Sequence, residues 1–373
     1  MKFLIVVGSA EDFLPFRGDL VDALLSRGMQ VHVALPDLDA NSVLHGKFLA
    51  KGLVVHKVTM QRAGMNPIAD LHTMWQLLQL IKAIKPDTVL ANMIKPVIYG
   101  MMASSMAGVP HRFALISGLG YAFTGENNQR GLLRRLAQWL YTLSLSGAHK
   151  TFFENPDDLN LFHQLGILKS NAPSCAVNGC GVDLDHYAYA SIPKGPPRFL
   201  LIARLLGDKG VREYAAAAKL VKAQYPEVHF ALVGWIDENP SAITQAELDA
   251  WIAEGTIDYM GRLADVRPAI AQCSVYVLPS YREGTPRSVL EAMSVGRAVI
   301  TTDAPGCRET VRDEDNGLLV PVGTVDELAK AMLRFIKNGE LVQRFGQRSR
   351  EIAEEKYDVH KVNQVMLNEM EIF

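Results

Sequence analysis

The feature that most constrains the fold is an alternation of short apolar runs with longer amphipathic segments. Short apolar runs are typical of buried parallel strands, and the amphipathic segments between them are typical of helices that cover both faces of the sheet. We therefore predict a doubly wound α/β fold. In the first half of the chain the predicted strands are 3–7, 30–35, 53–58, 87–92, 112–117 and 150–155, with helices over 16–28 and 71–85.

The same alternation begins again after residue 198. A chain of 373 residues is longer than one ordinary core accommodates, so we predict two doubly wound domains in tandem. The segment "DLDHYAYASIPKGPP" (183–197) is polar, aromatic and rich in Pro and Gly, which places the domain boundary there. In this second half the predicted strands are 198–204, 228–234, 256–261, 274–280 and 298–303, and the first is followed by a helix over 211–225.

Charge and composition exclude several classes of protein. The formal net charge of -2 argues against a dominant electrostatic grip on nucleic acid. No apolar stretch approaches the length of a membrane span, and "MKFLIVVGSAEDF" at the start is typical of a first strand rather than of a signal peptide. We therefore expect a protein of a reducing, cytoplasmic compartment with free thiols. No C-x-x-C pair occurs among its cysteines, Cys175, Cys180, Cys273 and Cys307.

The loop after the strand 198–204 carries two cations. In open parallel sheets, ligands bind beyond the carboxyl ends of the strands, so these loops are where a site is expected. Arg204 closes the strand and Lys209 follows in "LLGDKGV", just before the next helix. Arginine can hold a phosphate through two parallel hydrogen bonds and lysine acts as a point charge. The pair suits an anionic group, and two solvated surface charges are the alternative.

The stretch "SYREGTPRSVLEAMSVG" (280–296) places two glutamates around a helix start. Thr285 is a suitable N-cap and Pro286 a suitable first helical residue, so the helix would direct its free N–H groups at a bound anion. Glu283 precedes this start and Glu291 lies almost two turns inside the helix. Because carboxylates accept hydrogen bonds from hydroxyls, the two could hold a sugar and a ribose on either side of a diphosphate. The alternative is that neither glutamate binds a ligand, with Glu291 facing solvent on the helix and Glu283 an ordinary charge of the loop.

The array from "REGTP" to "TTDAPG" resembles the E-x7-E segment of the family 4 retaining glycosyltransferases of the GT-B fold. "ARLLGDKGV" resembles the phosphate-binding loop of that family and "NGCGVDLDHY" its interdomain connection. The resemblance implies two Rossmann-like domains that face each other across a cleft. It implies an acceptor-binding domain over 1–185, completed by a returning C-terminal helix over 357–373, and a nucleotide-sugar domain over 186–356.

The same resemblance implies a role for each residue of the motif. Arg204 and Lys209 would neutralise the donor diphosphate, with Glu283 beside the donor sugar as the third catalytic residue. Glu291 would bind the ribose hydroxyls. The remaining donor-binding residues would be the main chain of Gly284, Thr285 and Pro286, and Arg262 with Leu263 beside the nucleobase. The implied reaction is metal-independent transfer of a hexosyl group, without a cofactor, from a UDP-sugar and with retention at the anomeric carbon.

The first half of the chain narrows the resemblance. "RAGMNPIADL", "NMIKPVIYG" and "SGLGYAFTG" resemble the branch that builds capsule, O-antigen and diphospho-undecaprenol-linked oligosaccharides, with an N-acetylhexosamine such as GalNAc as a frequent donor sugar. Many relatives carry a histidine after the fourth strand, where this chain has Asn92 to Lys95. Asn92 and Lys95 are therefore candidates for acceptor contact. Gly118 and Gly120 are further candidates, since glycine lets a backbone approach a substrate, and a tight turn is their alternative.

A lipid-linked acceptor requires contact with a bilayer, and "RGLLRRLAQWLYTLSL" from residue 130 is the best candidate segment. Leucines recur at helical spacing beside Arg134, Arg135 and Trp139, as in a helix that lies in the membrane interface. The alternative is a helix that packs its leucines on the sheet, and the two can coexist. We expect a peripheral protein on the inner face of the cytoplasmic membrane.

Other functions are less well supported. Asp37/Asp39 and Asp183/Asp185 form Asp-x-Asp pairs that could hold a divalent metal, but they lie in a predicted turn and in the linker, so no essential metal is expected. "VVGSAEDF" lacks the G-x-G-x-x-G pattern of an NAD-dependent dehydrogenase. A GT-B nucleotide-sugar epimerase or hydrolase, and a non-catalytic nucleotide-sugar-binding scaffold, remain alternatives.

Overall fold

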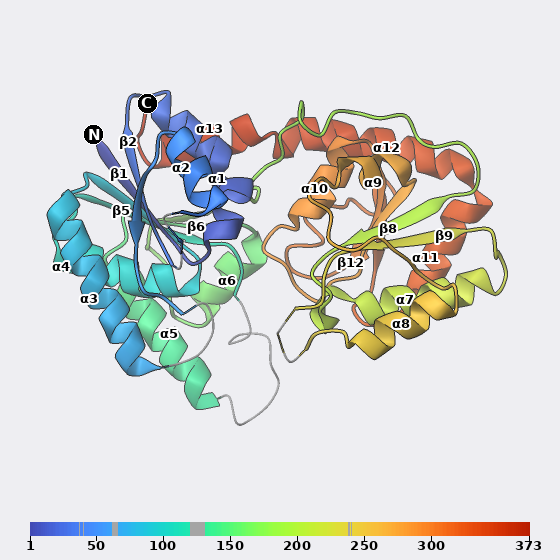
Figure 1. Cartoon of the computed structure of the whole chain (residues 1–373), viewed down its shortest axis with the longest axis horizontal. Helices are drawn as coiled ribbons and strands as arrows, with labels where there is room; N and C mark the ends of the chain where they lie inside the picture. Colours follow the sequence, from blue (N-terminus) through green and yellow to red (C-terminus); the bar gives the residue numbers. More distant parts are fainter. Residues whose placement is uncertain (37, 40, 62–65, 120–130, 238, 240) are drawn as a thin grey trace. The chain divides into compact units, whose positions relative to one another are not determined.

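The chain forms two compact units in a computed structural model (Figure 1). Unit 1 comprises Met1–Cys180 and Val362–Phe373, and unit 2 comprises Gly181–Lys361. The division precedes the predicted boundary segment because Val182 pairs with the end of unit 2, where its N–H donates to Tyr357 and its carbonyl accepts from Val359. The structure describes residues 1–36, 38–39, 41–61, 66–119, 131–237, 239 and 241–373, and of 131–133 the backbone alone.

Unit 1 contains a parallel sheet in the strand order β3-β2-β1-β4-β5-β6-β7. The order reverses between β1 and β4, which is the topological switch point of a doubly wound sheet. The first six strands were predicted, whereas the three-residue β7 is too short to carry a sequence signal. The strands are β1 (Lys2–Val7), β2 (Gln30–Leu35), β3 (Val54–Lys57), β4 (Thr88–Asn92), β5 (His111–Ile116), β6 (Lys150–Phe153) and β7 (Ser174–Ala176).

Helices cover both faces of this sheet (Figure 1). One apolar core joins the sheet to α1 (Ala10–Leu25), α2 (Val43–Ala50) and the end of α13 (Val359–Glu369). Helix α1 begins before the predicted residue 16 because the Ser9 hydroxyl accepts from the N–H of Asp12 and caps it. On the other face lie α3 (Pro67–Ile84), the π-helical turn η1 (Pro96–Gly100), α4 (Met101–Met106), α5 (Gly131–Leu145) and α6 (Pro156–Gln164).

Unit 2 repeats the plan with the strand order β10-β9-β8-β11-β12-β13. Its switch point lies between β8 and β11. The five predicted strands are present, and β13 was missed because it follows a turn-rich segment without a helix before it. The strands are β8 (Arg198–Ile202), β9 (His229–Val233), β10 (Asp258–Tyr259), β11 (Val275–Leu278), β12 (Ala298–Thr302) and β13 (Gly317–Val320).

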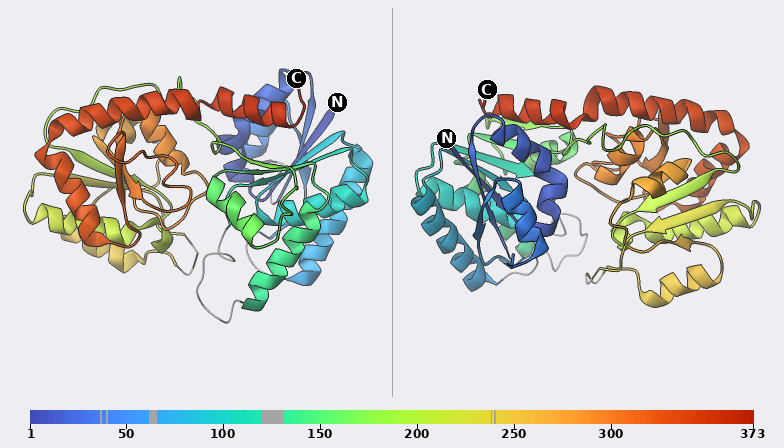
Figure 2. Two further views of the ribbon diagram at one scale, coloured as in Figure 1. Left: turned by 180° about the vertical axis from the view of Figure 1, so that it is seen from behind. Right: turned by 45° about the horizontal axis from the view of Figure 1, so that its top comes forward.

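The helices of unit 2 also pack on both faces of its sheet. One core contains side chains of α7 (Val211–Lys222), α8 (Gln245–Ala253), α11 (Val325–Lys337) and α12 (Gly339–Ile352). The opposite core contains side chains of α9 (Arg267–Gln272), α10 (Arg287–Ser294) and the π-helical turn η4 (Ala353–Tyr357). The chain then enters α13 and ends in unit 1, where both termini lie near each other (Figure 2).

Candidate functional site

The switch point of unit 2 brings together the two loops that carry the predicted cations and the predicted loop glutamate. Arg204 and Lys209 follow β8, and Glu283 follows β11, the neighbouring strand. The Lys209 ammonium donates to Glu283 Oε1 at 2.6 Å, with both side chains largely buried. Sequence reasoning placed these residues near one another, but it did not indicate that they form an ion pair.

Backbone contacts fix the Glu283 loop from both sides. The N–H of Tyr281 donates to the Asp208 carbonyl of the β8 loop at 2.8 Å. The N–H of Glu283 donates to the Pro305 carbonyl of the β12 loop at 2.9 Å. Gly306 has φ +81°, and a Cβ there would lie 2.2 Å from the Glu283 carbonyl oxygen, so only glycine permits this approach.

Arg204 has a carboxylate partner that the sequence did not suggest. Its guanidinium donates to Asp237 at 2.9 Å, and the Arg204 side chain is 37% exposed. Asp237 belongs to the loop after β9, the strand beside β8. Asp237 could have been found from its position in the sequence, because it lies in a loop that follows the carboxyl end of a strand. Ion pairs this exposed contribute at most about 1 kcal/mol, so an anionic ligand could replace Asp237 at small cost.

Glu291 is buried and paired within its own helix. Arg287 donates to it at 2.8 Å across one turn of α10. This i,i+4 pair was visible in the sequence but was not singled out. Burial, and after it the Glu291 carboxylate, raises the pKa of the nearby Tyr187 phenol above its ordinary value, which keeps Tyr187 protonated and able to donate.

The start of α10 differs from the prediction. Pro286, with φ -72° and ψ 105°, occupies the N-cap position, and the helix begins at Arg287. The proposed cap by Thr285 is therefore wrong, since the Pro ring fixes φ but allows this extended ψ. Thr285 is buried, and the segment from Glu283 to Thr285 lies in the loop before the helix.

An arginine and a tryptophan stack at the next two strand ends. The Arg262 guanidinium carbon lies 4.3 Å from the centre of the Trp235 ring. Trp235 follows β9, Arg262 follows β10, and Leu263 packs against the core beneath. A stacked guanidinium and indole offer a flat surface on which a nucleobase can lie. Trp235 was missed because a single aromatic residue after a strand carries no pattern.

A buried thiol beside these loops is not a nucleophile. Burial, followed by the charge of Glu283, raises the pKa of Cys307 to about 12. The thiol is therefore protonated near neutral pH, and a thiol in this state reacts slowly. Within the described residues no disulfide joins the four cysteines.

The switch point of unit 1 has a different chemistry. Asn92 ends β4 and is buried, and its Oδ1 has no hydrogen-bond partner among the described residues. Met93 has φ +80°, which is uncommon and strained for a residue other than glycine, and backbone strain of this kind clusters at active sites. Gly8, after β1, lies so close that a Cβ would be 3.3 Å from the Met93 sulfur. Asn92 Oδ1, a neutral hydrogen-bond acceptor, therefore lies at the carboxyl end of β4, where a ligand is expected.

Lys95 is not available as a free cation. It donates to Asp70 at 2.7 Å, and the Tyr99 hydroxyl donates to the other oxygen of Asp70 at 2.9 Å. Burial and the Asp70 carboxylate raise the pKa of Tyr99. Asp70, on α3, was not expected here. Gly118 has φ +140°, a conformation that favours glycine, and Gly120 lies outside the described residues.

The predicted membrane-contact residues lie on α5. Arg135 is exposed and Arg134 is half-buried, whereas Trp139 is 59% exposed. Tyr141, on the opposite side, is fully buried and anchors the helix to the core. Among the helices that the structure describes, none combines the length and apolarity needed to cross a bilayer.

The Asp-x-Asp pairs have structural roles where they can be seen. Asp183 accepts from the N–H groups of Asp185 and His186, and Asp39 accepts from Asn41. Asp37 lies outside the described residues. Within the described ranges no three His, Cys, Asp or Glu side chains converge as metal ligands.

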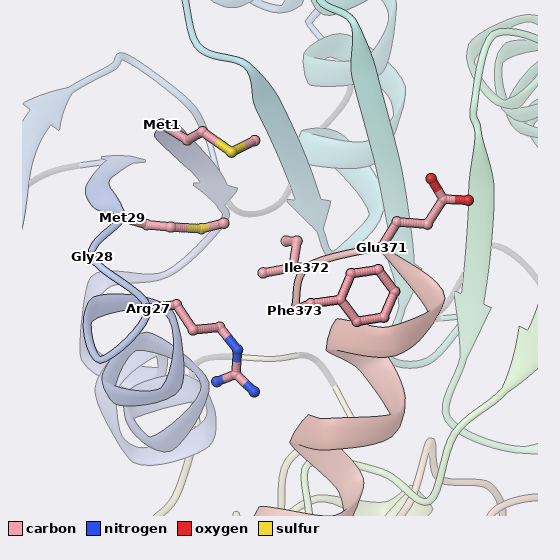
Figure 3. A pocket seen from close by; sticks show the side chains of 7 residues that line it. All are labelled: Met1, Arg27, Gly28, Met29, Glu371, Ile372 and Phe373. Atoms are coloured by element: carbon pink, nitrogen blue, oxygen red, sulfur yellow. The ribbon is translucent and has the colours of Figure 1, made fainter.

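A small pocket of unit 1 is lined by residues near the N-terminus and by the last residues of the C-terminal tail (Figure 3). Met1 precedes β1 and Met29 precedes β2, so the pocket adjoins the amino ends of the strands. Ligands of open parallel sheets bind at the carboxyl ends. The pocket, lined by Ile372 and Phe373 of the C-terminal tail, therefore does not lie where ligands of such sheets bind.

Two family models match the chain. The model "Glycosyl transferases group 1" matches residues 196–338, and the model "Glycosyl transferase 4-like" matches residues 4–155. Each match falls within one of the two units and includes its switch-point loops.

Curated relatives are similar over most of the chain. The N,N'-diacetylbacillosaminyl-diphospho-undecaprenol alpha-1,3-N-acetylgalactosaminyltransferase of Campylobacter jejuni is 29% identical over 339 residues, which cover 87% of both proteins. The UDP-Gal:alpha-D-GlcNAc-diphosphoundecaprenol alpha-1,3-galactosyltransferase of Escherichia coli is 25% identical and covers 72% of this chain and 70% of its own length.

Solved structures share the fold. Anabaena HepE in complex with UDP superposes with a TM-score of 0.79 at 19% identity, covering both chains completely. Sucrose-phosphate synthase from Thermosynechococcus elongatus gives a TM-score of 0.78 at 18% identity, covering 99% of this chain and 98% of its own. The chain therefore belongs to the group 1 and 4-like glycosyltransferases, has the GT-B fold and is a hexosyltransferase.

Proposed function

We propose that this protein transfers a hexosyl group from a UDP-sugar onto a saccharide carried by diphospho-undecaprenol, with retention at the anomeric carbon. The favoured donor sugar is N-acetylgalactosamine. The names of the relatives from Campylobacter jejuni and Escherichia coli, which act on diphospho-undecaprenol-linked sugars, support this substrate class. The product would be a longer lipid-linked oligosaccharide for a surface polysaccharide or glycan.

The observation that carries the proposal is the convergence of Arg204, Lys209 and Glu283 at the switch point of unit 2. When a glycosyl bond to a diphosphate breaks, negative charge grows on the departing phosphate oxygens. Arg204 and Lys209 would exchange their carboxylate partners for these oxygens and stabilise the charge as it develops. Glu283, released from Lys209, would accept hydrogen bonds from hydroxyls of the donor sugar.

Other residues of unit 2 would hold the rest of the donor. Glu291, oriented by Arg287, would accept from the ribose hydroxyls. The main chain of Gly284, Thr285 and Pro286 would contact the phosphate and the sugar. Arg262 and Leu263, with Trp235 stacked on Arg262, would lie beside the nucleobase. Because Glu283 and Glu291 would serve different parts of the donor, they are not the acid and base of a glycoside hydrolase.

Residues of unit 1 would bind the acceptor. Asn92 Oδ1, buried and without a partner in the described part of the chain, would accept a hydrogen bond from an acceptor hydroxyl. Lys95, held by Asp70, would support this loop, and the backbone at Gly118, with φ +140°, would allow close approach. Gly120, the other glycine candidate, lies outside the described residues. With Arg134, Arg135 and Trp139 of α5 at the bilayer, the protein would work at the cytoplasmic face of the inner membrane.

The test is release of nucleoside diphosphate from a panel of nucleotide sugars, with and without a bacterial extract of undecaprenyl-diphosphate sugars. Each reaction is run with EDTA and beside Glu283→Gln. Glu254→Gln is the matched control, since Glu254 forms an exposed pair with Lys219 in the same unit. We expect nucleoside diphosphate to be released from one donor, only when the lipid extract is present, and equally in the presence of EDTA. Glu283→Gln should lose this release, and the Glu254→Gln control should retain it.

Three results would contradict the proposal. Release without any acceptor would favour a nucleotide-sugar epimerase or hydrolase. Binding of a donor without release under any condition would favour a non-catalytic scaffold. Activity abolished by EDTA and restored by a divalent cation would show that a metal, rather than Arg204 and Lys209 alone, neutralises the diphosphate.

A further inference from the structure

Helix α3 presents an apolar stripe to solvent that sequence patterning did not reveal. Ile68, Leu71 and Trp75 are 82%, 61% and 55% exposed. Their spacing of three and four residues places them on one side of the helix. The opposite side, with Leu77 and Ile81, is buried in the core. The helix is thus apolar on both sides, although, within the part of unit 1 that the structure describes, only one side is buried in a core.

Helix α5 repeats the arrangement. Leu136, Trp139 and Leu143 have the same spacing and are 44%, 59% and 45% exposed. Both helices cover the same face of the unit 1 sheet (Figure 1), and α4 contacts each of them. Met106, at the end of α4, is exposed as well. The exposed stripes of α3 and α5 therefore have the same residue spacing, each contains an exposed tryptophan, and the short helix α4 packs against both helices.

The exposed charged side chains of α3, α4 and α5 are all positive. Helices α3 and α5, with the segment 96–106 between them, contain one acidic residue, Asp70. Asp70 is buried and paired with Lys95, so it adds no negative charge to the exposed side. Lys82 and Arg135 are exposed, and Arg134 is half-buried. An apolar surface with cations and no exposed acid is complementary to an anionic lipid bilayer.

We propose that α3 and α5 together form one bilayer-binding surface, in which α3 supplies apolar insertion and α5 supplies insertion and charge. We name it the α3–α5 surface. The inference rests on the proposed function for its purpose, which is to bring unit 1 to a lipid-linked acceptor. Tryptophan suits this location, since its ring is apolar and its N–H can remain hydrated at the headgroups. The residues that would enter the interface are Ile68, Leu71, Trp75, Leu136, Trp139 and Leu143.

The test uses the full chain and pure lipid vesicles, so that no acceptor or protein partner is present. Binding is measured by co-sedimentation with phosphatidylcholine vesicles, with and without phosphatidylglycerol, at low and high salt. One variant combines Leu71→Ser with Trp75→Ser, and a second combines Arg134→Gln with Arg135→Gln. The matched control combines Val43→Ser with Leu49→Ser, which removes two exposed apolar side chains, 81% and 54% exposed, from α2 on the other face of the sheet.

We expect the α3 variant to bind vesicles about tenfold more weakly or worse at every salt concentration, because apolar insertion is not screened. The α5 variant lacks two positive charges, so it should bind more weakly than the wild type only to vesicles that contain phosphatidylglycerol, and only at low salt. On phosphatidylcholine vesicles, or at high salt, the two should bind alike. The α2 control should bind as the wild type does. Trp75→Phe keeps an aromatic side chain and should retain binding while losing part of the blue shift of tryptophan emission on vesicle addition.

An α3 variant that binds as tightly as the wild type would overturn the inference. A wild-type chain that binds neither kind of vesicle would overturn it too, and would assign the surface to a protein partner or, if the chain dimerises in sedimentation, to a second copy. Nucleoside diphosphate release by the wild type is measured separately. Absent release with intact vesicle binding would count against the proposed function and leave this inference standing.

Discussion

The two units share one sheet plan but carry different chemistry at their switch points. In unit 2 the loops after β8 and β11 bear the ion pair Lys209–Glu283, and Arg204 pairs with Asp237 beside it. In unit 1 the corresponding edge bears a buried neutral amide, Asn92, next to a strained Met93. One edge suits an anionic ligand and the other suits a neutral hydroxyl.

The ion pairs of the two units also differ in burial. The Arg204 side chain is 37% exposed, whereas Arg17 and Glu154 in unit 1 are 3% and 8% exposed and meet at 2.5 Å. A pair that reaches solvent can exchange its partner for a substrate at small cost, whereas breaking the nearly inaccessible Arg17–Glu154 pair leaves an uncompensated charge. Lys209 and Glu283, 17% and 14% exposed, lie between these two cases. The difference teaches that an ion pair at a strand end indicates a ligand site where part of it stays accessible to solvent.

The largest effect should come from breaking the buried pair. Arg17→Met leaves Glu154 charged and buried, which should lower the free energy of unfolding by about 3–5 kcal/mol. Urea unfolding followed by circular dichroism measures this. Lys51→Met, which breaks an exposed pair with Asp22 in the same unit, should cost at most about 1 kcal/mol. Equal costs for the two variants would remove the distinction between buried and accessible pairs.

The next effect should be on catalysis in unit 2. On the proposed function, Lys209→Ala would remove a cation from the developing diphosphate charge and should lower kcat about 10²–10³-fold, while the fold is retained. Steady-state release of nucleoside diphosphate measures it. Lys219→Ala removes an exposed lysine of the same unit, paired with Glu254, and should leave kcat unchanged. A Lys209→Ala enzyme within threefold of wild type would show that the pair with Glu283 is merely structural.

A smaller effect should follow from displacing the Glu283 loop. Gly306→Ala would force a Cβ to within 2.2 Å of the Glu283 carbonyl, so we expect a loss of about 2 kcal/mol or more in stability and lower activity. Gly255→Ala has a similar φ, +66°, but meets no atom within 4 Å, and should cost about 1 kcal/mol without loss of activity. Thermal unfolding and turnover of both variants test this, and indistinguishable results would mean that the contact with Glu283 is unimportant.

The smallest effect concerns pH and unit 1. His32 Nδ1 lies 2.8 Å from His56 Nε2, and burial is the main cause that lowers the pKa of both rings below 6.5, with His56 also lowering that of His32. Below pH 6.5 the unfolded chain therefore binds more protons than the folded chain, and stability decreases as pH falls. We expect a loss on the order of 1 kcal/mol or less between pH 7 and 5, since His56 is partly solvated.

Unfolding at several pH values measures this loss. His56→Gln should reduce the slope, because it removes one titrating ring and its repulsion of His32, while burial still lowers the pKa of His32. A slope that persists unchanged in His56→Gln would assign the pH dependence to other groups.

Much of the fold followed from sequence pattern alone. The alternation of apolar runs with amphipathic segments is a local property, and it predicted the parallel sheets and the order of their strands along the chain. The pattern failed where the signal was short or overridden. Strand β7 has three residues, and the Ser9 cap extends α1 through Pro15, a residue that usually marks a boundary.

The site was predictable to the extent that its residues follow strands. Arg204, Lys209 and Glu283 occupy loops at carboxyl ends, so the sequence by itself determined that they would lie at one edge of unit 2. Only the tertiary structure decided their partners. Asp237 reaches Arg204 and Asp70 reaches Lys95 through strand order and helix packing, which join residues 33 and 25 positions apart.

Exposure was likewise decided by packing. The apolar residues of α3 and of α5 lie on more than one side of each helix, so the sequence alone does not say which side is covered. Which side is covered depends on how each helix packs against the sheet and its neighbours, and that choice left Leu71 and Trp75 in solvent while it buried Leu77. Local sequence thus determined the elements and the residues at their ends, whereas long-range packing determined which of those residues pair, which stay buried and which face solvent.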